Sequence, residues 1–169
     1  MNDQTRSMAA HAFHAAWDAL EADEYISAVE LARESLRLWT EVGGHRELAV
    51  GEWMVGRTRA FAGDFAAARV AASAAEQHLD SLGAEAEDWL HASIAELHAR
   101  AHSNEPTSIN YHQFYETAQT LIAGIHDRED RGLIEAQFSD LPAPETACAA
   151  HPPSLRRPAP PESNPSTGS

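Results

Sequence analysis

The sequence predicts an all-α fold for residues 1–140, and three observations lead to this class. Clusters of β-branched residues are rare, alanine is dense, and apolar residues recur at intervals of three and four along the chain. Glycine also follows an apolar run at Gly43, Gly63 and Gly83, which is a common signal for the end of a helix.

The breaks between apolar segments define the expected helices in order. The first helix ends before Ala22-Asp23, and the next three end at the three glycines. The loop around Pro106 separates the fifth helix from the sixth, which ends at Gly124. The connections are mostly short, so consecutive helices should pack as antiparallel hairpins. We expect helices over 7–21, 24–41, 46–61, 65–81, 86–101, 109–124 and 129–139.

An aromatic residue followed three positions later by alanine recurs in the second helix of each expected hairpin. The pairs are Tyr25 with Ala28, Phe65 with Ala68, and Tyr115 with Ala118. The ring can fill the space between hairpins, and the alanine lets the two helices of one hairpin approach closely. On the first helices, Ala16 and Gly56 would supply the opposing small residues.

This pattern resembles the tetratricopeptide repeat (TPR), whose small, aromatic and alanine positions match Gly56, Phe65 and Ala68. The resemblance covers roughly residues 8–126. The spacing from Phe65 back to Tyr25 exceeds the family's 34 residues, and the usual proline at each repeat's end is missing. The term TPR-like is therefore used, and helices longer than the standard are implied.

The resemblance implies a TPR-like right-handed superhelix of about three antiparallel hairpins plus a C-terminal capping helix. The final stretch before Asp140 would be this cap, with Leu133, Ile134 and Phe138 on its buried face. Over its whole length the chain is also similar to bacterial TPR-like proteins that end in an acidic helix before a proline.

Charge and composition narrow the classes of partner. The chain has 26 acidic residues against 12 arginines, for a net charge of −14. A surface this acidic repels phosphate backbones, so we expect no nucleic-acid partner. No basic segment with a following apolar run opens the sequence, and no long apolar run follows. We therefore expect a cytoplasmic protein with no membrane partner.

The last part of the chain differs from the rest. Eight of the nine prolines lie between Pro142 and Pro165, in a stretch rich in serine and alanine. Such a composition predicts a disordered Pro-rich tail over 141–169, although Leu155-Arg156-Arg157 could serve as a short linear motif. Cys148, the single cysteine, lies in this tail, which excludes an internal disulfide and a cysteine-based zinc site.

The expected binding surface is the concave groove, because the first helices of TPR-like stacks line it. Tryptophan and arginine are the residues most enriched in binding hot spots. An alternative stays open, in which the tryptophans only pack between hairpins and Arg57 pairs with Glu52, Glu96 or Asp88. The predicted binding residues are Phe13, Trp17, Glu52, Trp53, Arg57, Trp89, Glu96, His98, Arg100 and His102.

His98 and His102 also have the i, i+4 spacing of a metal-binding pair. His91 lies seven residues before His98, roughly 10 Å along a helix, which is too far to share one ion. No HExxH motif or Cys/His cluster accompanies the pair. We therefore expect no metal and no cofactor.

The motifs favour binding over catalysis. The chain has no glycine-rich phosphate loop, no GxSxG motif and no cysteine before residue 148. The primary expectation is a protein- or peptide-binding module or adaptor that uses the concave groove. The alternative is a small-molecule-binding protein, or an enzyme of a bacterial biosynthetic pathway, acting in the same groove. A groove of three repeats is short, and a homodimer packed through the alanine-rich helix 65–81 would extend it.

Overall fold

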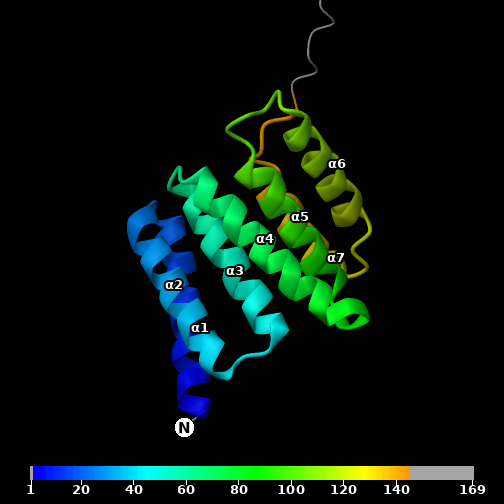
Figure 1. The fold of residues 1–169 in the computed structure, drawn as a ribbon. Coiled ribbons are helices and arrows are strands. Elements are labelled where there is room, and N and C mark those ends of the chain that lie inside the picture. The colour runs from blue at the N-terminus through cyan, green and yellow to red at the C-terminus, as the bar shows by residue number, and fades with distance from the viewer. Residues whose placement is uncertain (1, 145–169) are drawn as a thin grey trace, which may run out of the picture.

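The structure is a computed structural model that describes residues 2–144, and helices are its only regular secondary structure. The all-α prediction is confirmed for this part of the chain, and the predicted tail beyond residue 144 lies outside the described residues. Within residues 2–144 no helix combines the length and the apolar character needed to cross a membrane. The helices are α1 (Asn2–Glu21), α2 (Tyr25–Val42), α3 (His45–Phe61), α4 (Phe65–Leu82), α5 (Asp88–Ala101), α6 (Ile109–Ala123) and α7 (Arg128–Phe138), with a 3₁₀ turn η1 (Gly83–Glu85) before α5 (Figure 1).

Helix α1 begins five residues earlier than expected. Its extra turn is held by Arg6, whose Nη2 donates to the Val42 carbonyl at 2.6 Å, at the far end of α2. One turn further along, the buried Ser35 hydroxyl donates to the Ala9 carbonyl at 2.8 Å. These long-range contacts fix the start of α1, and no local sequence signal reports them.

The glycine signals have a clear conformational basis. Gly63 and Gly83 have φ of 81° and 54°, in the left-handed region that side chains with a Cβ disfavour. Immediately after Gly63, Asp64 caps α4 by accepting a hydrogen bond from the Ala67 amide at 3.1 Å. The reversal and the cap together place α4 directly against α3.

The helices of the described chain form three hairpins and a final helix. The hairpins pair α1 with α2, α3 with α4, and α5 with α6. The first helices also contact one another in sequence, so that α1, α3, α5 and α7 form an inner row. Figure 1 views the stack from the side of α2 and α4, with α1 and α7 behind. Helix α7 contacts α5 and α6, which places it at the end of the row.

Small residues allow this close packing. Ala28, Ala68 and Ala118, the alanines of the three aromatic–alanine pairs, are fully buried. A Cβ on Gly56 would stand 2.7 Å from Leu97 Cδ2, so glycine is needed where α3 meets α5. Helix α4 also turns four alanines inward, Ala68, Ala71, Ala72 and Ala75, and the homodimer through this helix stays a prediction.

Helix α7 packs differently from the expectation. Ile134 is buried and the Phe138 ring lies 4.6 Å from Tyr115, but Leu133 is 64% exposed. The prediction that Leu133 faces the core is wrong, because α7 covers only part of α5. Packing continues past residue 140, since Leu141 is buried among α5 and α6 residues.

Candidate functional site

The inner row bears a cleft with four aromatic rings in its walls, here called the aromatic cleft. Its volume is about 340 Å³, and all four helices of the row contribute to its walls. The Trp17 and Trp53 rings lie 5.8 Å apart at an angle of 59°. The lining residues are Phe13 and Trp17 from α1, Arg46, Val50 and Trp53 from α3, Trp89 and Ser93 from α5, and Asp130, Leu133, Ile134 and Gln137 from α7.

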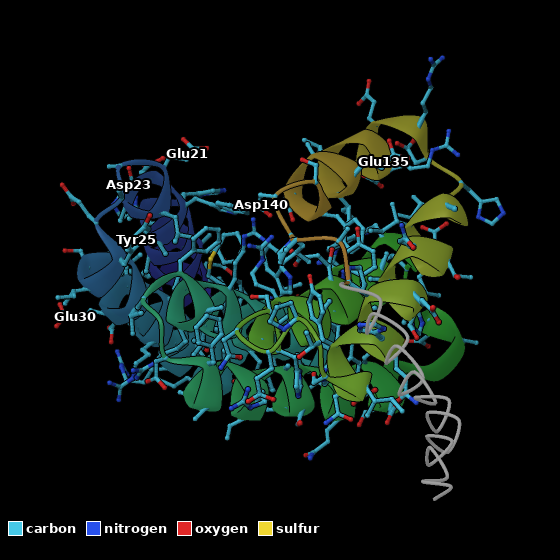
Figure 2. All side chains as sticks on the ribbon, turned by 90° about the horizontal axis from the view of Figure 1, so that it is seen from above. Glu21, Asp23, Tyr25, Glu30, Glu135 and Asp140 are labelled. Atoms are coloured by element: carbon cyan, nitrogen blue, oxygen red, sulfur yellow. The ribbon has the colours of Figure 1, made fainter. Side chains whose placement is uncertain are left out.

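A second hollow of about 560 Å³ continues the cleft toward the end of α1. The two hollows share Trp17, Leu133 and Gln137, so they form one surface, called the inner groove below. Glu21 and Asp140 line the second hollow from opposite sides. Figure 2 shows Glu21 at the α1 side and Asp140 at the α7 side of this space.

A buried ionic network lies beneath the groove. Arg57 Nη1 donates to both carboxylate oxygens of Glu96 at 3.3 Å. Arg100 Nε donates to Glu96 at 2.7 Å, and Arg100 Nη2 donates to Asp140 Oδ1 at 2.6 Å. Glu96 is fully buried, and the two arginines are almost as deeply buried. One carboxylate thus bridges two guanidinium groups in an environment that cannot tolerate an unpaired charge.

The pKa values of the two arginines in this network shift in opposite directions. Burial is the largest influence and lowers the pKa of Arg57, against a smaller opposing effect from Glu96. Burial also lowers the pKa of Arg100, but Glu96 and Asp140 together outweigh it, so the pKa is raised overall. Arg100 therefore holds the better-compensated charge, and Arg57 is the arginine that further acceptors would stabilise.

Aromatic rings surround the Arg57 guanidinium. Its central carbon lies 5.3 Å from the Trp17 ring, 5.8 Å from Trp53 and 5.3 Å from Phe61. These distances are within the range of cation–π attraction, which partly replaces the water that the arginine loses on burial. Arg57 thereby joins the aromatic cleft to the ionic network.

Two buried donors in the groove walls have no hydrogen-bond acceptor among the described residues. They are the indole Nε1–H of Trp53 and the Nε–H of Arg57. Both side chains are more than nine-tenths buried, and each lines part of the groove. An unsatisfied buried donor costs roughly 1–3 kcal/mol. Neither N–H is open to solvent, so a ligand acceptor could satisfy it only after the Trp53 or Arg57 side chain turns toward the groove.

Arg46 and Trp89 form the other end of the aromatic cleft. Arg46 Nε donates to Glu87 at 2.7 Å, and its guanidinium carbon lies 5.6 Å from the Trp89 ring. This arginine therefore has a carboxylate partner and an aromatic partner at the same time.

The structure brings together most of the predicted binding residues. Glu96 and Arg100 lie below the groove surface and support it through Arg57 and Asp140. Of the proposed partners for Arg57, the structure selects Glu96. The predicted residues that line the groove directly are Phe13, Trp17, Trp53, Arg57 and Trp89.

Three predicted residues lie elsewhere. Glu52 lines a separate hollow between α2, α3 and α4, because it sits about 100° around the helix from Trp53. His98 and His102 stack on Phe114 of α6, with ring centroids 4.8 Å apart in each case. Both rings point away from the face of α5 that carries Glu96, because a helix turns by about 100° per residue. The prediction that these two histidines line the groove is therefore wrong.

The two histidines have structural partners. His102 Nδ1 lies 2.8 Å from the His98 carbonyl, and a carbonyl can only accept, so Nδ1 carries the proton. His98 Nε2 lies 3.3 Å from a Glu76 carboxylate oxygen. Within residues 2–144, no three His, Cys, Asp or Glu side chains are grouped so that they could hold a metal ion.

Several residues that line the groove are not among the predicted binding residues. Asp140 stands at the end of the predicted folded part, and Leu133 and Gln137 belong to a helix expected only to cap the stack. An amphipathic pattern reports that a helix has a buried face, but it does not report which neighbour that face meets.

Comparison with protein-family models, with curated proteins and with solved structures gave no match.

Proposed function

We propose that this chain is a TPR-like binding module and that it holds a peptide segment of a partner protein in its inner groove. The supporting observation is that three first helices each present a tryptophan to one continuous groove, from Trp17, Trp53 and Trp89. Tryptophan gives a large rigid contact surface, which is why it dominates binding hot spots. The N–H groups of Trp53 Nε1 and Arg57 Nε have no acceptor in the protein, and a peptide backbone carries a carbonyl acceptor at every residue.

The shape of the groove favours a chain-like ligand. The aromatic cleft opens into the second hollow through shared walls, so the whole groove is elongated. A peptide can place one apolar side chain in the aromatic cleft while its backbone continues past Trp17. Leu133, exposed in the free protein and present in both walls, would be covered by such a ligand.

The test starts from a library of random peptides displayed on phage and selected on the full chain. The best enriched peptide is then titrated against Leu133→Asp by calorimetry. The substitution should weaken binding by about 2–5 kcal/mol, because the leucine contact is lost and the new carboxylate loses water against apolar surface. This loss exceeds the roughly 1 kcal/mol that one added exposed charge could gain with a basic peptide. Leu133 is exposed, so the variant should keep its helicity.

Ile26→Asp is the matched control, since Ile26 is 79% exposed on α2. It should bind the peptide as the unmodified chain does. Failure to enrich any peptide, or equal binding by both variants, would contradict the proposal.

A small molecule is the second candidate ligand, and the volume of the aromatic cleft favours it. At about 340 Å³ the cleft falls within the range of small-molecule pockets. Native mass spectrometry of the full chain isolated from its host cells would detect a retained molecule. A non-peptide mass that is released by Leu133→Asp and kept by Ile26→Asp would support this candidate over the peptide.

A further inference from the structure

The charges around the inner groove are unbalanced. Every arginine there already engages a carboxylate: Arg46 with Glu87, Arg57 with Glu96, and Arg100 with both Glu96 and Asp140. Three arginines therefore face five carboxylates. The five are Glu21, Glu87, Glu96, Asp130 and Asp140.

The excess belongs to Glu21 and Asp130, which have no ion-pair partner among the described residues. Glu21 is the last residue of α1, where the helix dipole already adds negative potential. Asp130 is half-buried in the first turn of α7 and lines the aromatic cleft. The two carboxylates thus lie at the two hollows of one groove.

A second feature of the same surface is a pair of buried hydrogen-bond donors that lie close to it. The Trp53 and Arg57 N–H groups lack acceptors although both side chains are almost fully buried. An acidic small molecule could satisfy them, but it would be repelled by the uncompensated carboxylates. A peptide backbone supplies neutral carbonyl acceptors and leaves the side chains free to carry positive charge.

Resting on the proposed function above, we propose that the partner segment is basic and apolar: a large apolar side chain enters the aromatic cleft, and neighbouring lysine or arginine side chains pair with Glu21 and Asp130. Backbone carbonyls of this segment accept from the two unpartnered donors once those side chains turn toward the groove. The net charge of −14 on the chain steers such a segment toward the protein from a distance, and the groove carboxylates fix where it binds.

The peptides enriched on the full chain test this inference by their composition. We expect lysine and arginine to be enriched beside leucine, phenylalanine or tryptophan. Enrichment of acidic or uncharged sequences would overturn the charge inference and leave the peptide-binding proposal standing. Absence of any enrichment would overturn the proposed function itself, so the two failures are distinguishable.

Two double variants distinguish attraction by the groove carboxylates from attraction by the overall negative charge of the protein. Glu21→Gln with Asp130→Asn should raise the Kd of an enriched basic peptide roughly tenfold at low salt and weaken its salt dependence. Glu30→Gln with Asp80→Asn removes the same amount of charge from exposed positions on α2 and α4, and should change the Kd less than twofold. Equal effects of the two double variants would show that attraction is non-specific and would overturn the assignment to the groove.

Discussion

Glu96 balances the buried charge beneath the groove, because it is the carboxylate shared by Arg57 and Arg100. A fully buried carboxylate between two guanidinium groups is stable as a set, and the set fails when one member is removed. The arrangement also holds the end of α7, since Arg100 Nη2 donates to the Gln137 carbonyl at 2.8 Å.

Glu96→Gln should therefore destabilise the protein by about 3–5 kcal/mol, because it leaves two buried arginines without full compensation. Urea denaturation followed by circular dichroism measures this loss. Glu34→Gln is the matched control, because Glu34 pairs with Arg37 on the exposed surface of α2, where solvent screens the pair, and its loss should change stability far less. Equal losses in the two variants would contradict the assigned role of Glu96.

His98 makes stability depend on pH. Burial is the largest influence and lowers its pKa, the nearby His102 lowers it further, and Glu76 opposes both. The neutral form is favoured in the folded state, whereas the unfolded chain binds a proton near pH 6.5. Stability from this residue is thus complete above about pH 6.5 and is lost as the pH falls through the lower folded-state pKa.

His98→Leu should flatten this dependence. The free energy of unfolding of the unmodified chain should fall as the pH drops below about 6.5, and that of the variant should fall less steeply. Denaturant titrations at several pH values give the slope. His11→Asn, a change at an exposed position on α1, should leave the slope as it is. A slope unchanged by His98→Leu would show that burial of this ring does not control the acid response.

Among single residues, the place of a side chain in the repeat pattern predicted only some of the residues that line the groove. Trp17, Trp53 and Trp89 followed from their places on three first helices, and the structure brings them to one groove. Glu52 and His98 did not follow, because one or two positions along a helix rotate a side chain by 100° or 200°. Placing these side chains requires the rotation of each helix about its axis, which tertiary packing sets.

At the scale of elements, helix positions were predictable because glycine reversals and capping residues are local. Gly63 and Asp64 end one helix and begin the next within two residues. The place of α7 was not predictable in the same way. Its short amphipathic sequence fits a cap on α5 and α6, and the exposure of Leu133 toward the groove emerges only from the assembled row.

Helix α7 depends on its N-terminal cap. The Asp127 side chain accepts hydrogen bonds from the Glu129 and Asp130 amides at 2.8 and 3.0 Å. Asp127→Ala should destabilise the protein by about 1 kcal/mol and weaken peptide binding, because the first turn of α7 carries Asp130. Denaturation and calorimetry measure the two effects.

The control for this cap is Glu24→Ala. Glu24 occupies the N-cap position of α2, but its side chain makes no capping hydrogen bond. It should therefore change neither stability nor binding by more than a few tenths of a kcal/mol. A larger loss in this control than in Asp127→Ala would contradict the importance given to the α7 cap.

At the scale of the whole molecule, the groove is a product of stacking. Helices α1 and α7 are not in contact with each other, yet both line the same two hollows above α3 and α5. Local sequence signals cannot report a surface built from four helices that are far apart in the chain. A ligand in this groove would connect the first and last helices of the row and should raise the stability of the whole fold.

The indole N–H signals of the tryptophans, observed by NMR with and without the selected peptide, test the central claim most directly. Variants that replace one tryptophan at a time by phenylalanine assign the signals. We expect the signals of Trp17, Trp53 and Trp89 all to shift on saturation, because all three rings line the groove that the peptide would fill. A peptide that binds while these three signals stay in place would contradict the claim.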